Sequence, residues 1–302
     1  MNKKSIGFKL VDALLILMMI LPLVGAMALQ VMTKPASDGV AIAGARIFFT
    51  IHMPIQDLPI TESQVNTWLI MISLFFLCLF FTHGLTEKCE SKRQAIAEWI
   101  VEKTDDLVRD NMGEYFKEFS PFVCGIMALS VFSSLSSMLG IFPPTSDINV
   151  VAGWALIVFI LITHYKLKGG FLNYLKSFTE PVPVLTPFNI IGEFATPVSM
   201  SFRHYGNVLS GSVISALVAA GLQAVSHALL SWIPGKIGEF PLFQIGLPAI
   251  LSLYFDIFSG CMQAFIFAML TMIYVSGAFP IEEWQKRKEK RQQKKAARKK
   301  AA

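Results

Sequence analysis

Apolar residues fall in long runs along this chain, separated by short polar segments. The first two runs cover residues 8–31 and 65–81, and a second pair covers residues 122–142 and 148–165. A bilayer-crossing helix needs about 17–25 apolar residues, so each run is long enough to span. A turn, Pro143-Pro144-Thr145-Ser146-Asp147, joins the second pair into a hairpin. Ser146 or Asp147 is the predicted N-cap of the helix that follows.

The longest apolar stretch runs from Phe188 to Trp232 and contains only two full charges, Glu193 and Arg203. As one helix it would be about 67 Å long, roughly twice the hydrocarbon thickness. It is either a hairpin without a strong turn signal or a single helix, steeply tilted and bent at Pro197. The last run, residues 247–279, is also longer than one span requires. The predicted fold is all-α and polytopic, with about five to six membrane helices, the last two long and steeply tilted.

The polar segments between these runs differ in character. Residues 92–119 alternate charges with apolar positions such as Ile96, Trp99, Ile100 and Leu107, which predicts one amphipathic surface helix. Residues 32–64 are interpreted as a polar loop, and residues 169–187, with three prolines, as a linker.

We divide the chain into residues 1–45, 46–280 and 281–302. The first part is an extra N-terminal membrane helix, or a signal segment, because Ala26-Met27-Ala28 resembles a cleavage site. The second is the main membrane domain. The tail holds ten Lys/Arg and three Glu, a net charge of +7. The positive-inside rule places the tail, and the chain's C-terminus, in the cytoplasm.

Composition narrows the class of protein. The chain has 302 residues, 54% of them hydrophobic, and a mean hydropathy of +0.55, which exclude an ordinary soluble domain. A basic tail beside a membrane helix indicates contact with anionic headgroups rather than with nucleic acid. The four cysteines form no CxxC pair, and the sequence holds no HExxH, P-loop, GxSxG or dinucleotide motif. We therefore predict no catalytic residue, no metal site and no cofactor.

Arg203 lies in the middle of the longest apolar stretch. An arginine at membrane depth costs about 2.5–3.5 kcal/mol on insertion scales, so it indicates an ion pathway or, alternatively, a salt bridge within the chain. Ser199, Asn207 and Ser210 follow the helical spacing that puts them on the same face as Arg203. Two nearby glycines would let another helix approach this region closely. These features favour a partner helix that carries an acid.

The final run has a matching polar stripe, formed by Ser252, Asp256, Ser259 and Gln263. Serines in membrane helices often bond to their own helix carbonyls, but an intramembrane carboxylate needs a partner or water. Glu193, near the start of its helix, has either a structural or an ionic role. His204 is either a packing residue or a relay.

Three motifs resemble those of one family, subunit a of F-type ATP synthases of the bacterial type. The resemblance covers roughly residues 46–280. The motifs are Pro197-Val198-Ser199-Met200-Ser201-Phe202-Arg203-His204-Tyr205-Gly206-Asn207, Gln263-Ala264-Phe265-Ile266-Phe267 and Pro144-Thr145-Ser146-Asp147-Ile148-Asn149. The chain differs from many relatives at Ser212, where they have Glu, and from some at Asp256, where they have His. This leaves the ligands of the entrance channel open.

The resemblance implies a non-catalytic, ion-translocating stator subunit in the inner (plasma) membrane of a bacterium. Two offset half-channels would face a rotating ring of c subunits, with Arg203 between them. Ser199, Asn207, Asp256, Gln263 and Glu193 would serve ion translocation. Expected partners are the c ring, the b-subunit peripheral stalk, the other ATP synthase subunits and the lipid bilayer.

Three alternative functions predict different features of the sequence. A self-contained transporter usually shows an internal repeat, which this sequence lacks. An intramembrane enzyme would need a nucleophile–base pair or a metal cluster, and a structural anchor would tolerate leucine at Arg203 and Asp256. The sequence does not choose between proton and sodium as the coupling ion, nor does it give the size of the c ring.

Overall fold

The computed structural model describes residues 6–33, 44–54, 56–87, 91–179, 182–230, 246, 250–251 and 253–289. Within this part of the chain, six helices are long and apolar enough to cross a membrane: Ile6–Thr33, Glu62–Thr82, Glu114–Leu139, Ile148–Lys168, Pro183–Leu230 and Tyr254–Gly277. The predicted all-α polytopic architecture is therefore confirmed.

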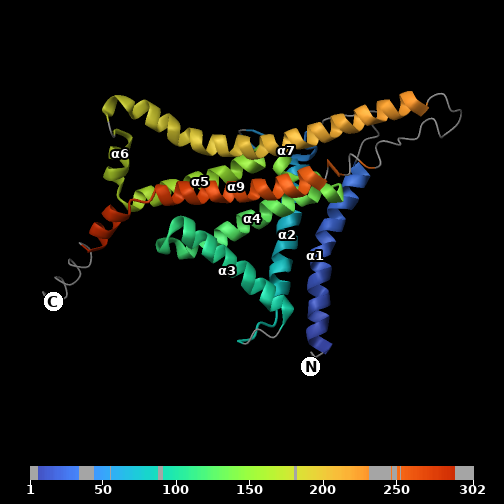
Figure 1. Cartoon of the computed structure of the whole chain (residues 1–302), viewed down its shortest axis with the longest axis horizontal. Helices are drawn as coiled ribbons and strands as arrows, with labels where there is room; N and C mark the ends of the chain where they lie inside the picture. The colour runs from blue at the N-terminus through green and yellow to red at the C-terminus, as the bar shows by residue number, and fades with distance from the viewer. Residues whose placement is uncertain are drawn as a thin grey trace.

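The helices form two groups (Figure 1). Four of them run alongside one another: α4 (Ser120–Leu135), α5 (Ile148–Lys168), α7 (Thr186–Leu230) and α9 (Gly260–Gly277). The other group is the pair α1 (Ile6–Thr33) and α2 (Glu62–Thr82), which lie side by side and run across the direction of α7. The molecule therefore presents α7 as one long outer edge.

The longest apolar stretch folds as one 45-residue helix, α7, and not as a hairpin. Pro197 lies inside this helix, and the residues on both sides of it remain helical. Proline lacks the N–H that would bond to the carbonyl four residues earlier, and such positions are common sites of helix bending. The two ends of α7 lie farther from α9 than its middle does (Figure 1).

The hairpin turn caps its second helix as predicted. Asp147 is the N-cap of α5, and its side chain accepts a hydrogen bond from the Asn149 backbone N–H at 2.9 Å. A short 3₁₀ turn, Pro144–Ser146, precedes it. Asp147 also accepts a hydrogen bond from Ser63 at the start of α2. The turn is thus tied to the helix pair α1–α2.

The core lies where α4, α5 and α9 meet. Its fully buried side chains include Val123, Val158, Phe267 and Met272. Aromatic rings close one end of it, because Phe116 packs against Tyr165 and Phe279. This core fixes the positions of the helices against which α7 packs.

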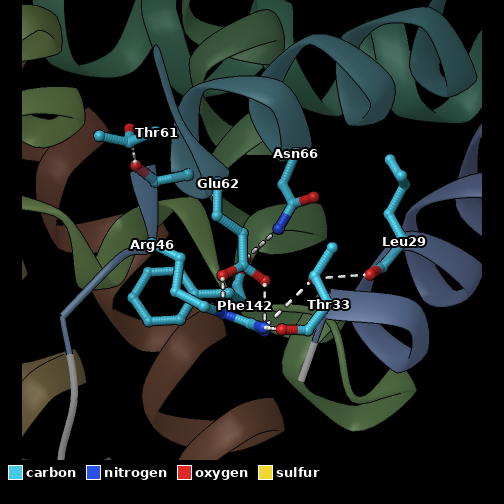
Figure 2. Close-up of polar contacts among 8 residues, drawn as sticks. Leu29, Thr33, Arg46, Thr61, Glu62, Asn66 and Phe142 are labelled. Atoms are coloured by element: carbon cyan, nitrogen blue, oxygen red, sulfur yellow. Dashed lines mark hydrogen bonds and ion pairs between the residues drawn. The ribbon is translucent and has the colours of Figure 1, made fainter. Parts of the chain in front are cut away.

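Ionic contacts hold α1 at both of its ends. At its C-terminal end, Arg46 donates to the Thr33 backbone carbonyl and pairs with the buried Glu62 at 3.0 Å (Figure 2). At the other end, Asp12 accepts from Arg93 at 2.9 Å. The segment that a signal-peptide interpretation would remove thus supplies one member of an ion pair with α3 (Lys92–Met112).

Three segments differ from the expected structure. The polar loop contains a two-stranded antiparallel hairpin, β1 (Ile47–Ile51) and β2 (Leu58–Thr61). The proline-containing linker contains a helix, α6 (Phe171–Thr179), followed by the 3₁₀ turn Pro183–Leu185. The amphipathic segment is two elements, α3 (Lys92–Met112) and a 3₁₀ helix (Glu114–Phe119), because Gly113 adopts φ 82° between them.

The glycine explains the break at this point, because its positive φ is costly for residues with a side chain. Ile96, Trp99 and Ile100 of the predicted apolar face are exposed, so these three side chains do not pack against the bundle. Beyond α9, residues 281–289 are helical, and Gln285 donates to the Tyr115 hydroxyl at 2.7 Å. The residues of the tail from 290 onwards lie outside the described part.

Candidate functional site

Helix α7 has two chemically different faces around Arg203. Met200, His204 and Gly211 are buried against the bundle. The four residues expected to share a face, Ser199, Arg203, Asn207 and Ser210, are all exposed. Among the residues that the structure describes, Arg203 forms no ion pair, so no acid of this part of the chain neutralises it. The guanidinium group faces outward in the middle of an apolar helix.

His204, the neighbour of Arg203, is a packing residue. Its side chain is completely buried, with ring centroids 5.8 Å from Trp154 and 5.5 Å from Phe267 in edge-to-face geometry. Its Nε2 lies 3.4 Å from the hydroxyl of Ser130. These contacts connect α7 to α4, α5 and α9, and they fix the rotation of α7 that turns Arg203 outward.

Asn207 and Gln263, both expected in the site, meet directly. The Asn207 side-chain amide donates to Oε1 of Gln263 at 2.6 Å. Gln263 is 3% exposed, so this bond satisfies a buried polar group and joins α7 to α9.

A cavity of about 120 Å³ lies beside this contact, between α4, α7 and the start of α9. We call it the Asp256 cavity. Its polar lining comes from Ser134, Ser137, Asn207, Ser212, Asp256 and Ser259. Asp256 and Ser259 belong to a π-helical turn, Tyr254–Ser259, that precedes α9. Such turns are rare and are frequent at functional sites.

Two glycines allow the helices around the Asp256 cavity to approach closely. A Cβ on Gly211 would lie 2.9 Å from the Phe255 ring, and a Cβ on Gly260 would lie 2.5 Å from the Ser134 Cβ. Both positions therefore require glycine in this arrangement. Of the two glycines near Arg203 that were expected to allow close approach, Gly211 does so, whereas a Cβ on Gly206 would meet no atom within 4 Å.

A second cavity, of about 650 Å³, lies at the other end of the bundle, between α5, α6, α7 and the end of α9. We call it the Glu193 cavity. Glu193 pairs with Lys166 Nζ at 3.0 Å and accepts a hydrogen bond from the Tyr174 hydroxyl at 3.3 Å. Burial and the nearby Glu193 carboxylate raise the pKa of Tyr174, so its hydroxyl remains a donor. The cavity is also lined by Lys176, Asn189 and Glu283.

Arg203 lies between the two cavities along α7. Glu193 precedes it by ten residues and Ser212 follows it by nine, which correspond to about 15 Å and about 13 Å along a helix. The sequence-predicted residues therefore separate into two places. Asn207, Asp256, Ser259 and Gln263 come together at one end, Glu193 lies at the other, and Ser199 lies one turn before Arg203. Ser252 is outside the described residues.

The family model for the ATP synthase A chain matches residues 64–276, well over half of the chain. The chain belongs to this family. It is therefore a subunit a of the F-type ATP synthase, an ion-translocating stator subunit and a multi-pass membrane protein.

This subunit a is similar to bacterial proteins, and the similarity covers most of the length of both chains. A sodium-ion-specific ATP synthase subunit a from Propionigenium modestum is 27% identical, over 80% of this chain and 88% of that protein. Subunits a from Crocosphaera subtropica and Legionella pneumophila are each 30% identical, over 77% and 76% of this chain and 93% and 91% of those proteins.

Several residues of the site in this subunit a were not predicted. Lys166 and Tyr174 are not among the residues that the sequence pattern singles out, and Tyr174 lies in the segment 169–187 that is interpreted as a linker. Ser134 and Ser137 are likewise absent from the predicted site, although the sequence carries a signal for them. Five serines occur within eight residues of an otherwise apolar helix, at Ser130, Ser133, Ser134, Ser136 and Ser137.

Proposed function

We propose that this subunit a forms two offset half-channels against the rotating c ring and that Arg203 separates them. The observation that carries the proposal is the position of Arg203, on the outward face of α7 and between the two cavities. An arginine at membrane depth needs a partner or water, and no acid among the described residues pairs with Arg203.

The Asp256 cavity and the Glu193 cavity are the candidate polar ends of the two half-channels. An ion would enter one, bind a carboxylate on the c ring, travel with the rotating ring and leave through the other. Both cavities border α7, and about 28 Å of helix separates Glu193 from Ser212. A direct path between them would have to pass Arg203, whose charge repels cations.

Arg203 has a second task in this mechanism. Its positive charge favours the ionised form of a nearby carboxylate, so it would promote release of the ion from the ring. Arginine suits this role because it stays protonated at any working pH, whereas a buried lysine can lose its proton. Asn207 and Gln263 would position the polar surface beside it.

The orientation follows from the charges around the Glu193 cavity. Lys166, Lys168 and Lys176 lie at that end, as does the start of the basic tail. The positive-inside rule then puts this end and the C-terminus in the cytoplasm, and the Asp256 cavity toward the outer side of a bacterial inner membrane. The exposed apolar face of α7 would contact the c ring, and the b-subunit stalk would contact other surfaces of the subunit.

The test uses the whole ATP synthase reconstituted in liposomes, with Arg203→Ala in this subunit and Arg109→Ala, on exposed α3, as the control. We expect Arg203→Ala to abolish ATP-driven ion pumping while the soluble head still hydrolyses ATP, and Arg109→Ala to pump normally. Coupled pumping by Arg203→Ala would overturn the proposal. Transport by the purified subunit alone would instead favour a self-contained transporter.

A further inference from the structure

We propose that the β-hairpin of β1 and β2 lies on the membrane surface and inserts one apolar face into the lipid. This face, which we call the hairpin face, consists of Phe49 and Ile51 of β1 and Leu58 of β2. The hairpin follows α1 and precedes α2, so it belongs to the helix pair that runs across the direction of α7. Its contact with lipid is independent of the half-channels proposed above, because no residue of β1 or β2 is among the described residues that line the two cavities.

The hairpin face is exposed in the described part of the chain. Phe49 is 54% exposed, Ile51 43% and Leu58 40%. Successive side chains of a strand point to opposite faces, so Phe49 and Ile51 share one face, and Leu58 shares it as the partner of Ile51. Ile60, the partner of Phe49, is buried, so the hairpin face continues into the body of the protein. Neither strand contains a charged residue.

Both ends of the hairpin are fixed at the ends of membrane-spanning helices. Directly before β1, Arg46 donates to the backbone carbonyl of Thr33, the last residue of α1, and pairs at 3.0 Å with Glu62, the first residue of α2 (Figure 2). Strand β2 ends at Thr61, directly before Glu62. Helix α2 has 21 residues and is about 31 Å long, which matches the hydrocarbon thickness of about 30 Å. The hairpin therefore starts and ends at the boundary between the hydrocarbon and the headgroups.

The chemistry of a two-stranded hairpin sets how deep it can lie. An isolated hairpin is only marginally stable in water, so its apolar face needs something to pack against. The outer edges of the two strands carry unpaired backbone N–H and C=O groups, which are not tolerated in the hydrocarbon. At the headgroup level, the side chains of the hairpin face reach the acyl boundary while the strand edges stay hydrated. The exposed pair of His52 and Asp57, 3.0 Å apart between the strands, also suits this polar layer.

The apolar surface at this end of α1 continues into the hairpin face. Val31 and Met32, in the last turn of α1, are largely exposed. Exposed apolar surface that is continuous with a membrane-crossing helix is covered by lipid. Because Arg46 binds the ends of both α1 and α2, lipid contact by the hairpin would hold this end of the helix pair at a fixed depth.

The test is spin labelling of the whole ATP synthase, reconstituted in vesicles of phosphatidylcholine and phosphatidylglycerol. The native cysteines are first replaced by alanine, and a nitroxide is attached to Phe49→Cys, Ile51→Cys or Leu58→Cys. The matched control is Thr50→Cys, because Thr50 lies between the first two positions, is exposed and points to the opposite face. Electron paramagnetic resonance then measures collisions of each label with oxygen, which concentrates in lipid, and with a nickel chelate, which stays in water.

We expect labels on the hairpin face to meet the nickel chelate about tenfold less often than the label on Thr50→Cys, because a polar solute is excluded from lipid. Their collisions with oxygen should be more frequent than those of the control. Leu58→Cys repeats the measurement on the second strand, so the result does not depend on β1 alone. Equal access of the chelate to all four labels would place the hairpin in water and overturn the proposal. Labels on the hairpin face that neither reagent reaches would show that another subunit covers it, which overturns lipid contact as well.

Discussion

The two cavities beside α7 are built from opposite chemistry. The Glu193 cavity is large and is lined by a charged pair, Lys166 and Glu193, with the Tyr174 hydroxyl bonded to the acid. The Asp256 cavity is small and is lined by hydroxyls and one acid, at a point where two glycines allow the helices to touch. A direct ion pair joins two helices at the Glu193 cavity, whereas close packing at glycines joins the helices at the Asp256 cavity.

Because of this difference, the two cavities should tolerate an added methyl group to different degrees. A charged pair across a roomy cavity can adjust to an added methyl group, because side chains and water can move. A cavity formed where glycines touch the Phe255 and Ser134 side chains cannot, because protein interiors are close-packed and yield little to extra volume. The same small change should therefore have unequal effects at the two ends of α9.

The largest effect is expected from a methyl group at the packed end. In Gly260→Ala the new Cβ would meet Ser134 at 2.5 Å, so α9 and α4 must separate. Overpacking of this kind costs about 1–3 kcal/mol. Because the displaced surface includes the Asp256 cavity, we expect coupled ATP synthesis to fall about tenfold, a change of about 1.4 kcal/mol. The rate is measured in the reconstituted enzyme.

The comparison arm is Gly277→Ala, at the other end of the same helix. A Cβ there meets no atom within 4 Å, and the residue borders the larger cavity. Alanine also favours a helix over glycine by up to about 1 kcal/mol, so synthesis should change less than about twofold. Equal losses in the two variants would show that the two ends of α9 do not differ in packing.

Much of the fold was predictable because it depends on local signals. The apolar runs, the Asp147 cap and the absence of a strong turn in the longest stretch all lie within single segments. Helix α6 and the β-hairpin were missed for the opposite reason. The hairpin is exposed and short, and α6 is held by contacts such as the Asn189 amide donating to the Phe178 carbonyl, 11 residues away.

The outward polar face of α7 was predictable from helical spacing, but the two cavities were not. The pairing of Glu193 with Lys166 depends on how α5 and α7 cross, which spacing within one helix does not give. The π-helical turn at Asp256 similarly accompanies the fit of Phe255 onto Gly211. Sequence patterns identify the residues of such a site more easily than they identify which residues meet.

An intermediate effect is expected from removing one charge at the open end. Lys166→Met would leave the Glu193 carboxylate, whose side chain is 7% exposed, with the Tyr174 hydroxyl as its only side-chain partner among the described residues. Losing a hydrogen bond to a charged group costs about 1.5–3 kcal/mol, and less here because the Lys166 side chain is 29% exposed. We expect several-fold slower pumping and a lower melting temperature of the complex.

The double variant Lys166→Met/Glu193→Gln separates pairing from overall damage. Removing both charges leaves no buried carboxylate without its cation, so the melting temperature should return most of the way to that of the unchanged protein. If the effects of the two substitutions on the melting temperature simply add, the Lys166–Glu193 pair contributes nothing to stability. The Glu193 cavity would then not differ from the Asp256 cavity through electrostatics.

The smallest effect is expected at Tyr174, and it should depend on pH. Tyr174→Phe removes a hydrogen bond of 3.3 Å to Glu193, and since the acid keeps Lys166 we expect less than about a twofold change in pumping near neutral pH. Because burial and Glu193 raise the pKa of Tyr174 above 10.0 in the folded protein, the unfolded chain loses this proton first as the pH rises. The unchanged protein should therefore lose stability above about pH 10 more steeply than Tyr174→Phe, whose lysines are the same. Melting curves of the two complexes between pH 8 and pH 11 measure this. Parallel curves throughout would mean that the Tyr174 hydroxyl is not held beside Glu193, and the acid would then rest on Lys166 alone.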